Sequence, residues 1–268
     1  MGYTGDGHVF ALTGAYNFNT DDFWRNWLKD LMLGQKDNSE GYIGSTVPAQ
    51  GKAGVGFLSM LGWGNAISII PKMMESVFGD EEILKEIYPS LKTFVECEIK
   101  RMKDDLWISP SLGDWLSLNG SMAWAAMNNG PVSNSFIVND LRVITELSSR
   151  FGYEEDYIRY KSQYKKTRDA WRRMWITPDG TVASDYQSAY IMALKFLDLE
   201  GEEREKVEKK FVENVRKNGL TTGFFGTEHI LPLLAEIGER ELCYDILFSR
   251  DCPGWLYQID RGATTPWE

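Results

Sequence analysis

The sequence predicts an all-α fold: a six-hairpin (α/α)6 barrel that is incomplete at both termini. Two observations lead to this prediction. Apolar residues recur at helical spacing along most of the 268-residue chain, whereas the strict alternation that marks strands is scarce. The links between the expected helices alternate between short and long, as they do when antiparallel helix pairs return the chain to a common face.

The first hairpin shows the helical signals most clearly. Asn19 is expected to cap its second helix, with Phe18 and Phe23 placed to form a hydrophobic staple. Acidic residues fill the first turn of that helix, and an apolar stripe then runs to Leu31. Pro89 is expected in the first turn of its helix, where a missing N–H costs little. Further helices are expected near residues 7–17, 65–78, 90–103, 135–150, 154–174, 186–198, 202–217, 227–237 and 239–248.

The order of the links decides which ends of the helices form the active face. Short links are expected at Asn19, Gly79, Gly152, Gly201 and Gly238. Longer links, rich in Gly, Trp and Asp, are expected at 34–62, 104–134, 175–185, 218–226 and 249–264. Five hairpins and a last inner helix starting near Thr265 would then make the incomplete ring. Inner helices would begin near residues 7, 65, 135, 186, 227 and 265, and the long loops before them would build the active face.

Composition places the chain among globular proteins with neutral ligands. No linker or abrupt change of composition divides it, so we expect one domain over residues 1–268. Thirty-nine acidic residues against 29 basic ones give a net charge of −10, which disfavours nucleic acid and anionic membranes as partners. Ten Trp, twelve Tyr and thirteen Phe exceed what packing alone usually recruits, so some rings are expected to face a ligand.

The cysteines and the hydropathy pattern give weaker indications. Cys97, Cys243 and Cys252 fit neither a disulfide framework nor a zinc-ligand spacing, so we expect buried, reduced thiols. Free thiols favour a cytoplasmic location. No apolar run reaches the roughly 20 residues that a membrane-spanning helix needs.

Five glycine-rich motifs fall on the long loops. Glycine lets backbone approach a ligand closely, and an indole offers a flat apolar surface to the C–H face of a sugar ring. A single Trp is more often a core residue than a sugar platform, so the repetition of the pattern on one face carries the argument. The motifs are Gly2-Tyr-Thr-Gly-Asp6, Gly62-Trp-Gly-Asn65, Gly113-Asp-Trp-Leu116, Thr221-Thr-Gly-Phe-Phe-Gly-Thr227 and Gly262-Ala-Thr-Thr-Pro-Trp-Glu268.

Two carboxyl groups at the ends of the chain could act as a hydrolytic pair. Cleaving a glycoside with inversion needs an acid and a base about 6.5–9.5 Å apart, with a water molecule between the base and the anomeric carbon. Asp6 and Glu268 would meet if the last inner helix closed against the first. The structural alternative is that Asp6 caps the first helix and Glu268 is a frayed terminal residue.

Other kinds of site lack their parts. His8 and His229 are the only histidines, and neither a His-Glu-x-x-His nor a Gly-x-Ser-x-Gly motif is present. No metal ligands are therefore expected. His8 could contact a sugar from the start of the first helix or fill a packing role. The Gly54-Val-Gly56 stretch does not follow a strand in a βαβ unit, which excludes a dinucleotide site.

Together these motifs resemble the catalytic domain of bacterial α-L-rhamnosidases, the inverting enzymes of glycoside hydrolase family 78. The resemblance covers nearly the whole chain, and the motifs follow the family's order at roughly its spacing. The segments that carry it are Gly2-Tyr-Thr-Gly-Asp-Gly-His-Val-Phe-Ala11, Gly62-Trp-Gly-Asn-Ala66, Gly113-Asp-Trp-Leu116, Gln187-Ser-Ala-Tyr190, Thr221-Thr-Gly-Phe-Phe-Gly-Thr227 and Ile259-Asp-Arg-Gly-Ala-Thr-Thr-Pro-Trp-Glu268.

The resemblance assigns roles to individual residues. It implies that Glu268 is the general base, that Asp6 contacts the rhamnose, and that the indoles of Trp63 and Trp115 line the sugar pocket. The family's general-acid glutamate would lie just before Met1, so these 268 residues alone are expected to be inactive. The full set of expected substrate-binding residues is Tyr3, His8, Trp63, Asn65, Asp114 and Trp115.

The chain departs from the family's pattern at three of these motifs. Tyr3 stands where Trp is common, Asn65 where Asp is common, and Pro266 where an apolar residue is common. Tyr3 could preserve stacking and add a hydroxyl group. Asn65 loses a charge, and Pro266 biases Thr265 away from helical backbone.

The resemblance implies a parent enzyme that hydrolyses terminal α-L-rhamnosides with inversion and needs no organic cofactor. Its partner would be a rhamnose-containing oligosaccharide or glycoside, with no nucleic acid and no membrane. Two alternatives remain: a carbohydrate-binding α/α barrel without catalysis, and a related six-hairpin glycosidase that acts on another glycone.

Overall fold

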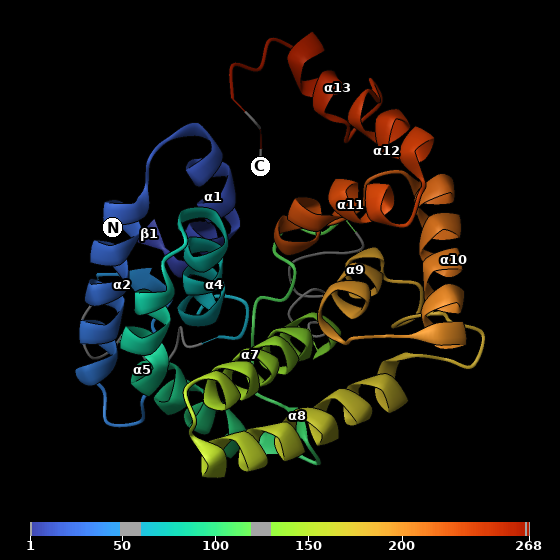
Figure 1. Cartoon of the computed structure of the whole chain (residues 1–268). Helices are drawn as coiled ribbons and strands as arrows, with labels where there is room; N and C mark the ends of the chain where they lie inside the picture. The colour runs from blue at the N-terminus through green and yellow to red at the C-terminus, as the bar shows by residue number, and fades with distance from the viewer. Residues whose placement is uncertain (1, 49–59, 119–129, 266, 268) are drawn as a thin grey trace. The chain divides into compact units, whose positions relative to one another are not determined.

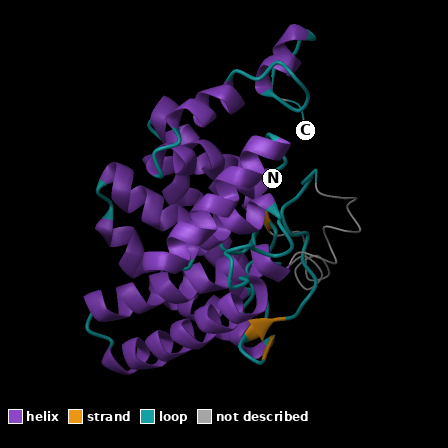
Figure 2. Ribbon diagram, turned by 90° about the vertical axis from the view of Figure 1, so that its right-hand side faces the viewer, coloured by secondary structure: helices purple, strands orange, loops and turns teal. Residues whose placement is uncertain are grey.

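The computed structural model describes residues 2–48, 60–118, 130–265 and 267. This part of the chain is helical, apart from four two-residue strands and the connecting loops (Figure 2). None of its helices combines the length and the apolar character that a membrane crossing requires. The chain divides into two compact units, Met1–Ser111 with Ser133–Trp171 and Leu112–Val132 with Arg172–Glu268.

Helical hairpins are the repeating element of both units (Figure 1). Each hairpin joins two helices through a link of two to four residues: 18–20, 79–80, 151–153, 197–200 and 237–239. The expected positions of the short links are therefore confirmed, although Gly201 itself begins a helix. The helices are α1 (Thr4–Asn17), α2 (Asp21–Lys36), α4 (Ala66–Phe78), α5 (Glu81–Lys100), α7 (Gly130–Arg150), α8 (Glu154–Trp175), α9 (Gln187–Phe196), α10 (Gly201–Asn218), α11 (Phe224–Glu236), α12 (Arg240–Leu247) and α13 (Trp255–Asp260).

The four strands form two small antiparallel pairs. β1 (Gly2–Tyr3) pairs with β2 (Thr46–Val47), and β3 (Met102–Lys103) pairs with β4 (Leu106–Trp107). The first pair holds the start of α1, because Thr4 donates from its backbone N to Ser45 O at 2.8 Å.

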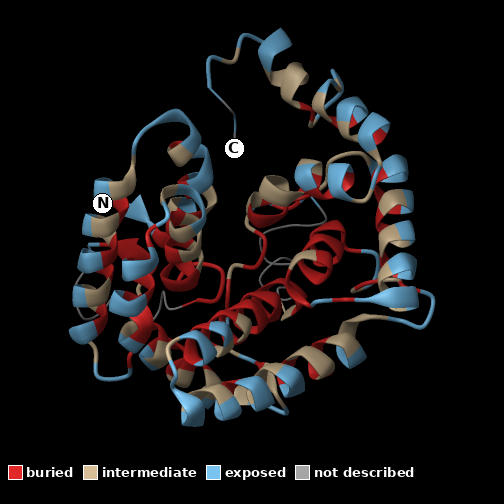
Figure 3. Ribbon diagram, in the orientation of Figure 1, coloured by how far each residue is buried: buried red, intermediate tan, exposed pale blue. Residues whose placement is uncertain are grey.

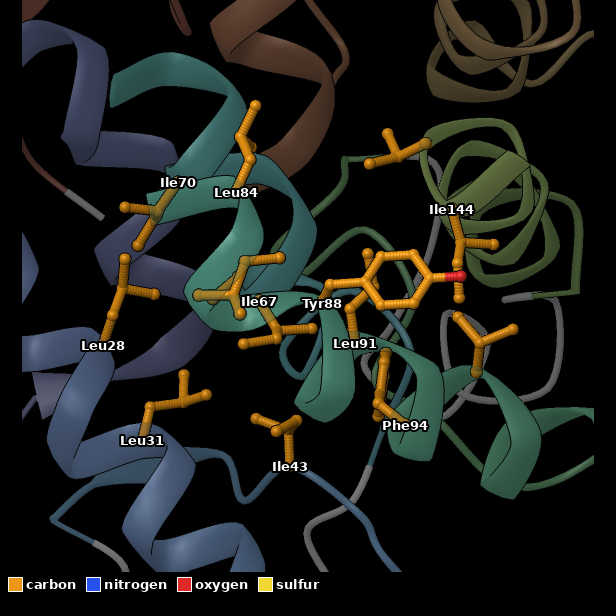
Figure 4. Close-up of a cluster of buried hydrophobic side chains, with 14 of the residues drawn as sticks. Leu28, Leu31, Ile43, Ile67, Ile70, Leu84, Tyr88, Leu91, Phe94 and Ile144 are labelled. Carbon is orange, nitrogen blue, oxygen red and sulfur yellow. The ribbon is translucent and has the colours of Figure 1, made fainter. Parts of the chain in front are cut away.

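An apolar core between α2, α4, α5 and α7 holds the first unit together (Figure 4). It lies on one face of each helix, as the helical periodicity predicts. Full burial of a Leu or Ile side chain contributes about 1.5–3 kcal/mol, so a cluster of this size dominates the stability of the unit. Its labelled members include Leu28, Leu31, Ile67, Ile70, Leu84, Leu91, Phe94 and Ile144.

The second unit is organised around α9. This helix is buried along nearly its whole length, whereas α10 exposes one face to solvent (Figure 3). α9 packs against both α10 and α11, and α11 packs against α12. On the solvated face of α10, Glu202 and Lys206 form an ion pair at 2.8 Å. Within this unit α9 is thus a buried inner helix and α10 a solvated outer one.

The structure corrects the expected start of one helix. α5 begins at Glu81, because the Asp80 side chain accepts a hydrogen bond from Ile83 N at 3.1 Å and caps the helix there. Pro89 therefore lies inside the helix and not in its first turn. The core burial of residues on both sides, such as Ile87 and Leu91, outweighs the lost backbone hydrogen bond.

Three smaller expectations were also wrong. The residue that caps α2 is Thr20 and not Asn19, and Phe18 and Phe23 are both exposed and do not act as a buried staple. α13 lies within the expected loop 249–264. The three cysteines are free thiols, but only Cys97 is buried, and burial raises the pKa of this thiol to about 12. Cys243 is half-buried and Cys252 is exposed.

Leu84 gives a direct test of the core of the first unit. Leu84→Ala should lower the free energy of unfolding by about 2–5 kcal/mol, because it leaves a cavity in a fully buried site. Lys85→Ala, the next residue on the exposed side of the same helix, should change it by less than about 0.5 kcal/mol. Denaturation followed by circular dichroism measures both, and equal effects would contradict the assignment of this core.

Candidate functional site

The first unit brings the first two glycine-rich motifs into contact. The indole of Trp63, which is 5% exposed, lies against the bare backbone of Gly5 in the first turn of α1. A Cβ atom at Gly5 would lie 2.9 Å from Trp63 Nε1 and 3.0 Å from Cδ1, which no side chain tolerates without displacing the ring. The glycine of the first motif therefore makes room for the tryptophan of the second, and the position of the ring depends on α1.

His8 joins the same two motifs from the next turn of α1. Its Nε2 donates a hydrogen bond to Gly62 O at 2.6 Å, and its ring meets Phe136 edge-on with centroids 5.9 Å apart. Burial lowers the pKa of His8 to about 4, so near neutral pH the ring is uncharged and carries its proton on Nε2. A structural role is thus established for His8, and direct contact with a sugar stays a prediction.

Asn65 closes the turn that carries Trp63. Its Oδ1 accepts a hydrogen bond from Gly62 N at 2.5 Å, and its Nδ2 donates to Asp140 Oδ2 on α7 at 2.6 Å. Ser68 Oγ is also hydrogen-bonded to Asp140, on Oδ1. Asn65, Ser68 and Asp140 are all fully buried, so this polar network lies inside the unit. Direct contact of Asn65 with a ligand stays a prediction.

The other two expected residues of the first unit are open to solvent. Tyr3 lies on β1 directly before α1 and is 52% exposed. Asp6 lies in the first turn of α1 with its side chain exposed, and the cap position of that helix is Tyr3. The structural alternative, in which Asp6 caps the helix, is therefore wrong, and the Asp6 carboxylate is accessible to a ligand.

The second unit joins three further motifs through the carboxylate of Asp114. Its Oδ2 accepts hydrogen bonds from Ser188 Oγ and from Gly223 N at 2.7 Å. Its Oδ1 accepts from Phe225 N at 2.6 Å and from Gly226 N at 3.2 Å. Burial raises the pKa of Asp114, and these four hydrogen bonds oppose the rise. Asp114 thus satisfies the backbone N–H groups at the start of α11, which a helix cannot satisfy by itself.

Gly223 allows the two loops to approach this closely. A Cβ atom there would overlap Trp115 O and lie 2.6 Å from Ser117 N, both of which are backbone atoms. Phe224 N donates to Trp115 O at 2.8 Å. The backbone of Trp115 is therefore fixed against α11 while its side chain remains partly exposed. Leu116 follows with φ of 61°, a conformation that costs a non-glycine residue energy.

The Gln187-Ser-Ala-Tyr190 motif completes this loop arrangement. Gln187 Oε1 accepts from Thr221 N at 2.9 Å, and its Nε2 donates to Gly219 O at 2.8 Å. Two residues of the motif, Gln187 and Ser188, thus hold the loop before α11 and the carboxylate of Asp114. In this unit the motifs hold one another's loops in place through hydrogen bonds.

The predictions for the C-terminal motif are tested only in part. Glu268 and Pro266 lie outside the described residues, so the roles expected for them stay predictions. Trp267, between them, is half exposed, and its backbone N donates to Gln258 Oε1 at 2.8 Å. Within the described ranges no three His, Cys, Asp or Glu side chains are grouped so that they could hold a metal ion.

The sequence interpretation missed Asp140. A signal for it was present, because an aspartate falls on the apolar side of α7 between Ile137 and Ile144, where a buried polar residue needs a partner. It also missed Glu228, in the second turn of α11, whose pKa is raised by burial to about 7, with Lys195 opposing the rise.

Comparisons with known proteins agree with these motifs. The sequence profile of a family described as the bacterial alpha-L-rhamnosidase six-hairpin glycosidase domain matches residues 1–268. An alpha-L-rhamnosidase of Formosa agariphila is 32% identical over 283 residues, which cover 100% of this chain and 29% of the relative. One of Streptomyces avermitilis is 29% identical over 270 residues, covering 100% of this chain and 25% of the relative.

Solved structures give the same result. The crystal structure of the Streptomyces avermitilis alpha-L-rhamnosidase complexed with L-rhamnose superposes on this chain with a TM-score of 0.88 and 28% identity. The match covers 100% of this chain and 25% of that protein. The native Aspergillus terreus enzyme superposes with a TM-score of 0.89 and 28% identity, covering 100% of this chain and 32% of that protein. The chain thus spans about a quarter to a third of the length of these relatives, and the six-hairpin helical fold is established.

Gly5 and Gly7 offer a matched test of the contact with Trp63. Gly5→Ala should displace the indole and weaken binding of any ligand that stacks on it by about 1–3 kcal/mol. Gly7→Ala makes the same helix-favouring change in the same helix, but its Cβ would face Trp27 at 3.2 Å. Calorimetry with L-rhamnose should separate the two variants, and equal affinities would show that the ring position is irrelevant to binding.

Variants of Asp114 and Ser188 test whether the Asp114 carboxylate anchors the loops of the second unit. Asp114→Asn should destabilise the unit by about 2 kcal/mol or more, because an amide turns an N–H group toward backbone donors that need an acceptor. Ser188→Ala removes one donor of the four and should cost about 1 kcal/mol. Denaturation curves of the two variants give the comparison, and a smaller loss for Asp114→Asn than for Ser188→Ala would refute the anchoring role.

Proposed function

Because this chain belongs to the bacterial α-L-rhamnosidase six-hairpin glycosidase family, we propose that it forms part of the catalytic domain of an enzyme that hydrolyses terminal α-L-rhamnosides with inversion. The observation that carries the proposal is the match of the family profile along all 268 residues. The likeness to a rhamnosidase that holds L-rhamnose in its crystal structure supports the choice of sugar.

The geometry of the first unit suits a neutral sugar. Trp63 keeps a small exposed area, 5% of its surface, and α1 holds its indole in place; His8 beside it is buried and uncharged near neutral pH. Asp6 and Tyr3 add an accessible carboxylate and phenol at the start of the same helix. An aromatic ring with a few polar groups around it is the usual composition of a sugar-binding site. We assign Trp63 to stacking on the glycone and Asp6 to its hydroxyl groups.

The second unit has a candidate sugar-binding ring of its own, that of Trp115. Its backbone is held by α11 through Phe224 N, and its side chain remains partly accessible. Asp114 beside it acts on the substrate indirectly, because its two oxygens already accept four hydrogen bonds that shape the loop. We therefore assign Asp114 a positioning role in place of the direct substrate contact that the sequence predicts.

The chemistry needs two carboxyl groups with different tasks. One protonates the leaving oxygen, and the other removes a proton from the attacking water on the opposite face of the sugar. The resemblance assigns the base to Glu268, and the proposed attack forms the C1–O bond to water as the bond to the leaving oxygen breaks. The proton from the acid passes to the leaving group, so the products are an alcohol and L-rhamnose of inverted configuration.

Glu268→Gln in the complete protein tests this assignment. It should lower kcat about 10²–10⁴-fold, the usual contribution of a positioned acid or base, with L-rhamnose affinity unchanged within a few fold. Glu202→Gln, on the solvated face of α10, is the matched control and should leave kcat unchanged. NMR of the first-formed sugar should show β-L-rhamnose.

Binding and activity measurements on the complete protein separate the proposed rhamnosidase from the two alternative functions. Rhamnose binding without hydrolysis of any rhamnoside would favour a carbohydrate-binding barrel. Hydrolysis of another glycoside in preference to rhamnosides would favour a six-hairpin glycosidase with a different glycone. A Glu268→Gln variant with full activity would remove Glu268 from the mechanism.

A further inference from the structure

A chain of buried hydrogen bonds connects α7 to the turn that carries Trp63. Asp140 on α7 has no exposed surface, and its Oδ2 accepts a hydrogen bond from Asn65 Nδ2 at 2.6 Å. The Oδ1 of the same Asn65 amide accepts from Gly62 N at 2.5 Å. Asp140 thus reaches the backbone beside Trp63 through one side chain, although 75 residues separate Asn65 from Asp140 along the chain.

Three side chains hold the backbone of this turn. Ser111 Oγ donates to Leu61 O at 2.9 Å, Asn65 accepts from Gly62 N, and His8 donates to Gly62 O at 2.6 Å. Gly62 itself has φ of 100°, which only glycine adopts without strain. These contacts hold the backbone before Trp63 in place, and the hydrogen bond to Asp140 orients the Asn65 amide.

We propose that Asp140 is a positioning residue for sugar binding, which acts through Asn65 to hold the Gly62 turn and the indole of Trp63 in the orientation that a glycone requires. This inference rests on the proposed function for the identity of the ligand. The hydrogen-bond path from Asp140 to Gly62, the residue before Trp63, does not depend on it.

The network is complete when Asp140 carries a proton. Ser68 Oγ lies within hydrogen-bond distance of both Asp140 Oδ1 and Asn65 O, which is 3.0 Å away. A protonated Asp140 donates to Ser68 Oγ, and the Ser68 hydroxyl then donates to Asn65 O. Burial raises the pKa of Asp140 to about 8, and the negative charge of Glu98 on α5 adds to the rise. The hydrogen bonds that Ser68 and Asn65 donate to the ionised carboxylate oppose it.

The sign of the pH dependence follows from this raised pKa. The protonated carboxyl stabilises the folded turn fully below the ordinary pKa of 3.8, and this contribution is lost as the pH rises through about 8. Rhamnose carries no group that titrates near pH 8, so a loss of affinity around that pH arises from a titrating group of the protein. Asp140→Asn mimics the protonated carboxyl, because its Nδ2 can donate to Ser68 while its Oδ1 accepts from Asn65. This variant should therefore bind rhamnose without the pH dependence.

Asn65→Asp is the critical substitution. It sets two carboxyl groups against each other at the 2.6 Å contact. The proton of Asp140 must then be shared with position 65 and is lost to Ser68, whose single proton serves only one of its two acceptors, so the network loses one hydrogen bond. The exchange Asn65→Asp/Asp140→Asn restores one amide and one carboxyl group in the opposite order. The carboxylate introduced at position 65 can then accept from Gly62 N, and the amide at position 140 can donate back to it.

Calorimetry with L-rhamnose on the complete protein at pH 7 measures the effect. Asn65→Asp should weaken binding about tenfold, the scale for a buried hydrogen bond lost at the turn, whereas Asp140→Asn and the double exchange should remain within about threefold of the wild type. Hydrogen exchange of the Gly62 amide should be faster in Asn65→Asp and near the wild-type rate in the double exchange. Wild-type affinity should fall between about pH 6 and 9, around the raised pKa, and that of Asp140→Asn should stay constant.

Ser148→Ala is the matched control for destabilisation. Ser148 is fully buried on the same helix and bonds to Ile144 O and Tyr88, away from the turn. It should lower the melting temperature and leave rhamnose affinity and Gly62 exchange unchanged. An equal loss of affinity in Ser148→Ala and Asn65→Asp would overturn the proposal, as would a double exchange as defective as Asn65→Asp.

The hydrogen-exchange measurement separates this inference from the proposed function. If the wild-type protein fails to bind L-rhamnose, the proposed function is wrong and the positioning claim for sugar fails with it. If the wild type binds rhamnose and Asn65→Asp changes neither affinity nor Gly62 exchange, the proposed function stands and the role of Asp140 is refuted.

Discussion

Backbone N–H groups buried in glycine-rich loops need acceptors, and in each unit one buried side chain meets this need. Asp114 accepts from three amides at the start of α11, and Asn65 accepts from Gly62 N before α4. An unsatisfied buried donor costs about 1–3 kcal/mol, which is a large part of the net stability of a domain. The loops that carry Trp63 and Trp115 therefore have defined conformations only while these two side chains are in place.

This constraint explains why the motifs combine glycine with one polar residue. Gly5 and Gly223 allow an indole and a backbone, respectively, to approach where any Cβ would collide. The polar residue then accepts hydrogen bonds from the backbone of the loop whose close approach the glycine allows. Because these loops are already ordered, ligand binding does not have to order them. The exposed side chains of Asp6 and Tyr3 are therefore attached to backbone that is held in place before a ligand binds.

The helical class and the positions of the short links could be predicted from local signals: apolar periodicity indicates helices, and glycine marks the turns between them. The start of α5 could not, because the burial of Ile87 and Leu91 decides it and the local rule for Pro89 does not. The site motifs were found by their composition, but the internal roles of Asn65 and Asp114 depend on partners 74 to 112 residues away along the chain. Sequence spacing does not show such contacts.

The central claim is that the turn held by Asn65 presents Trp63 to a rhamnose ring. A crystal structure of the complete protein with L-rhamnose tests it most directly. The account predicts that a C–H face of the sugar lies on the indole of Trp63, with Asp6 within hydrogen-bond distance of a sugar hydroxyl. A sugar bound elsewhere, with the Trp63 ring covered only by protein, would contradict it.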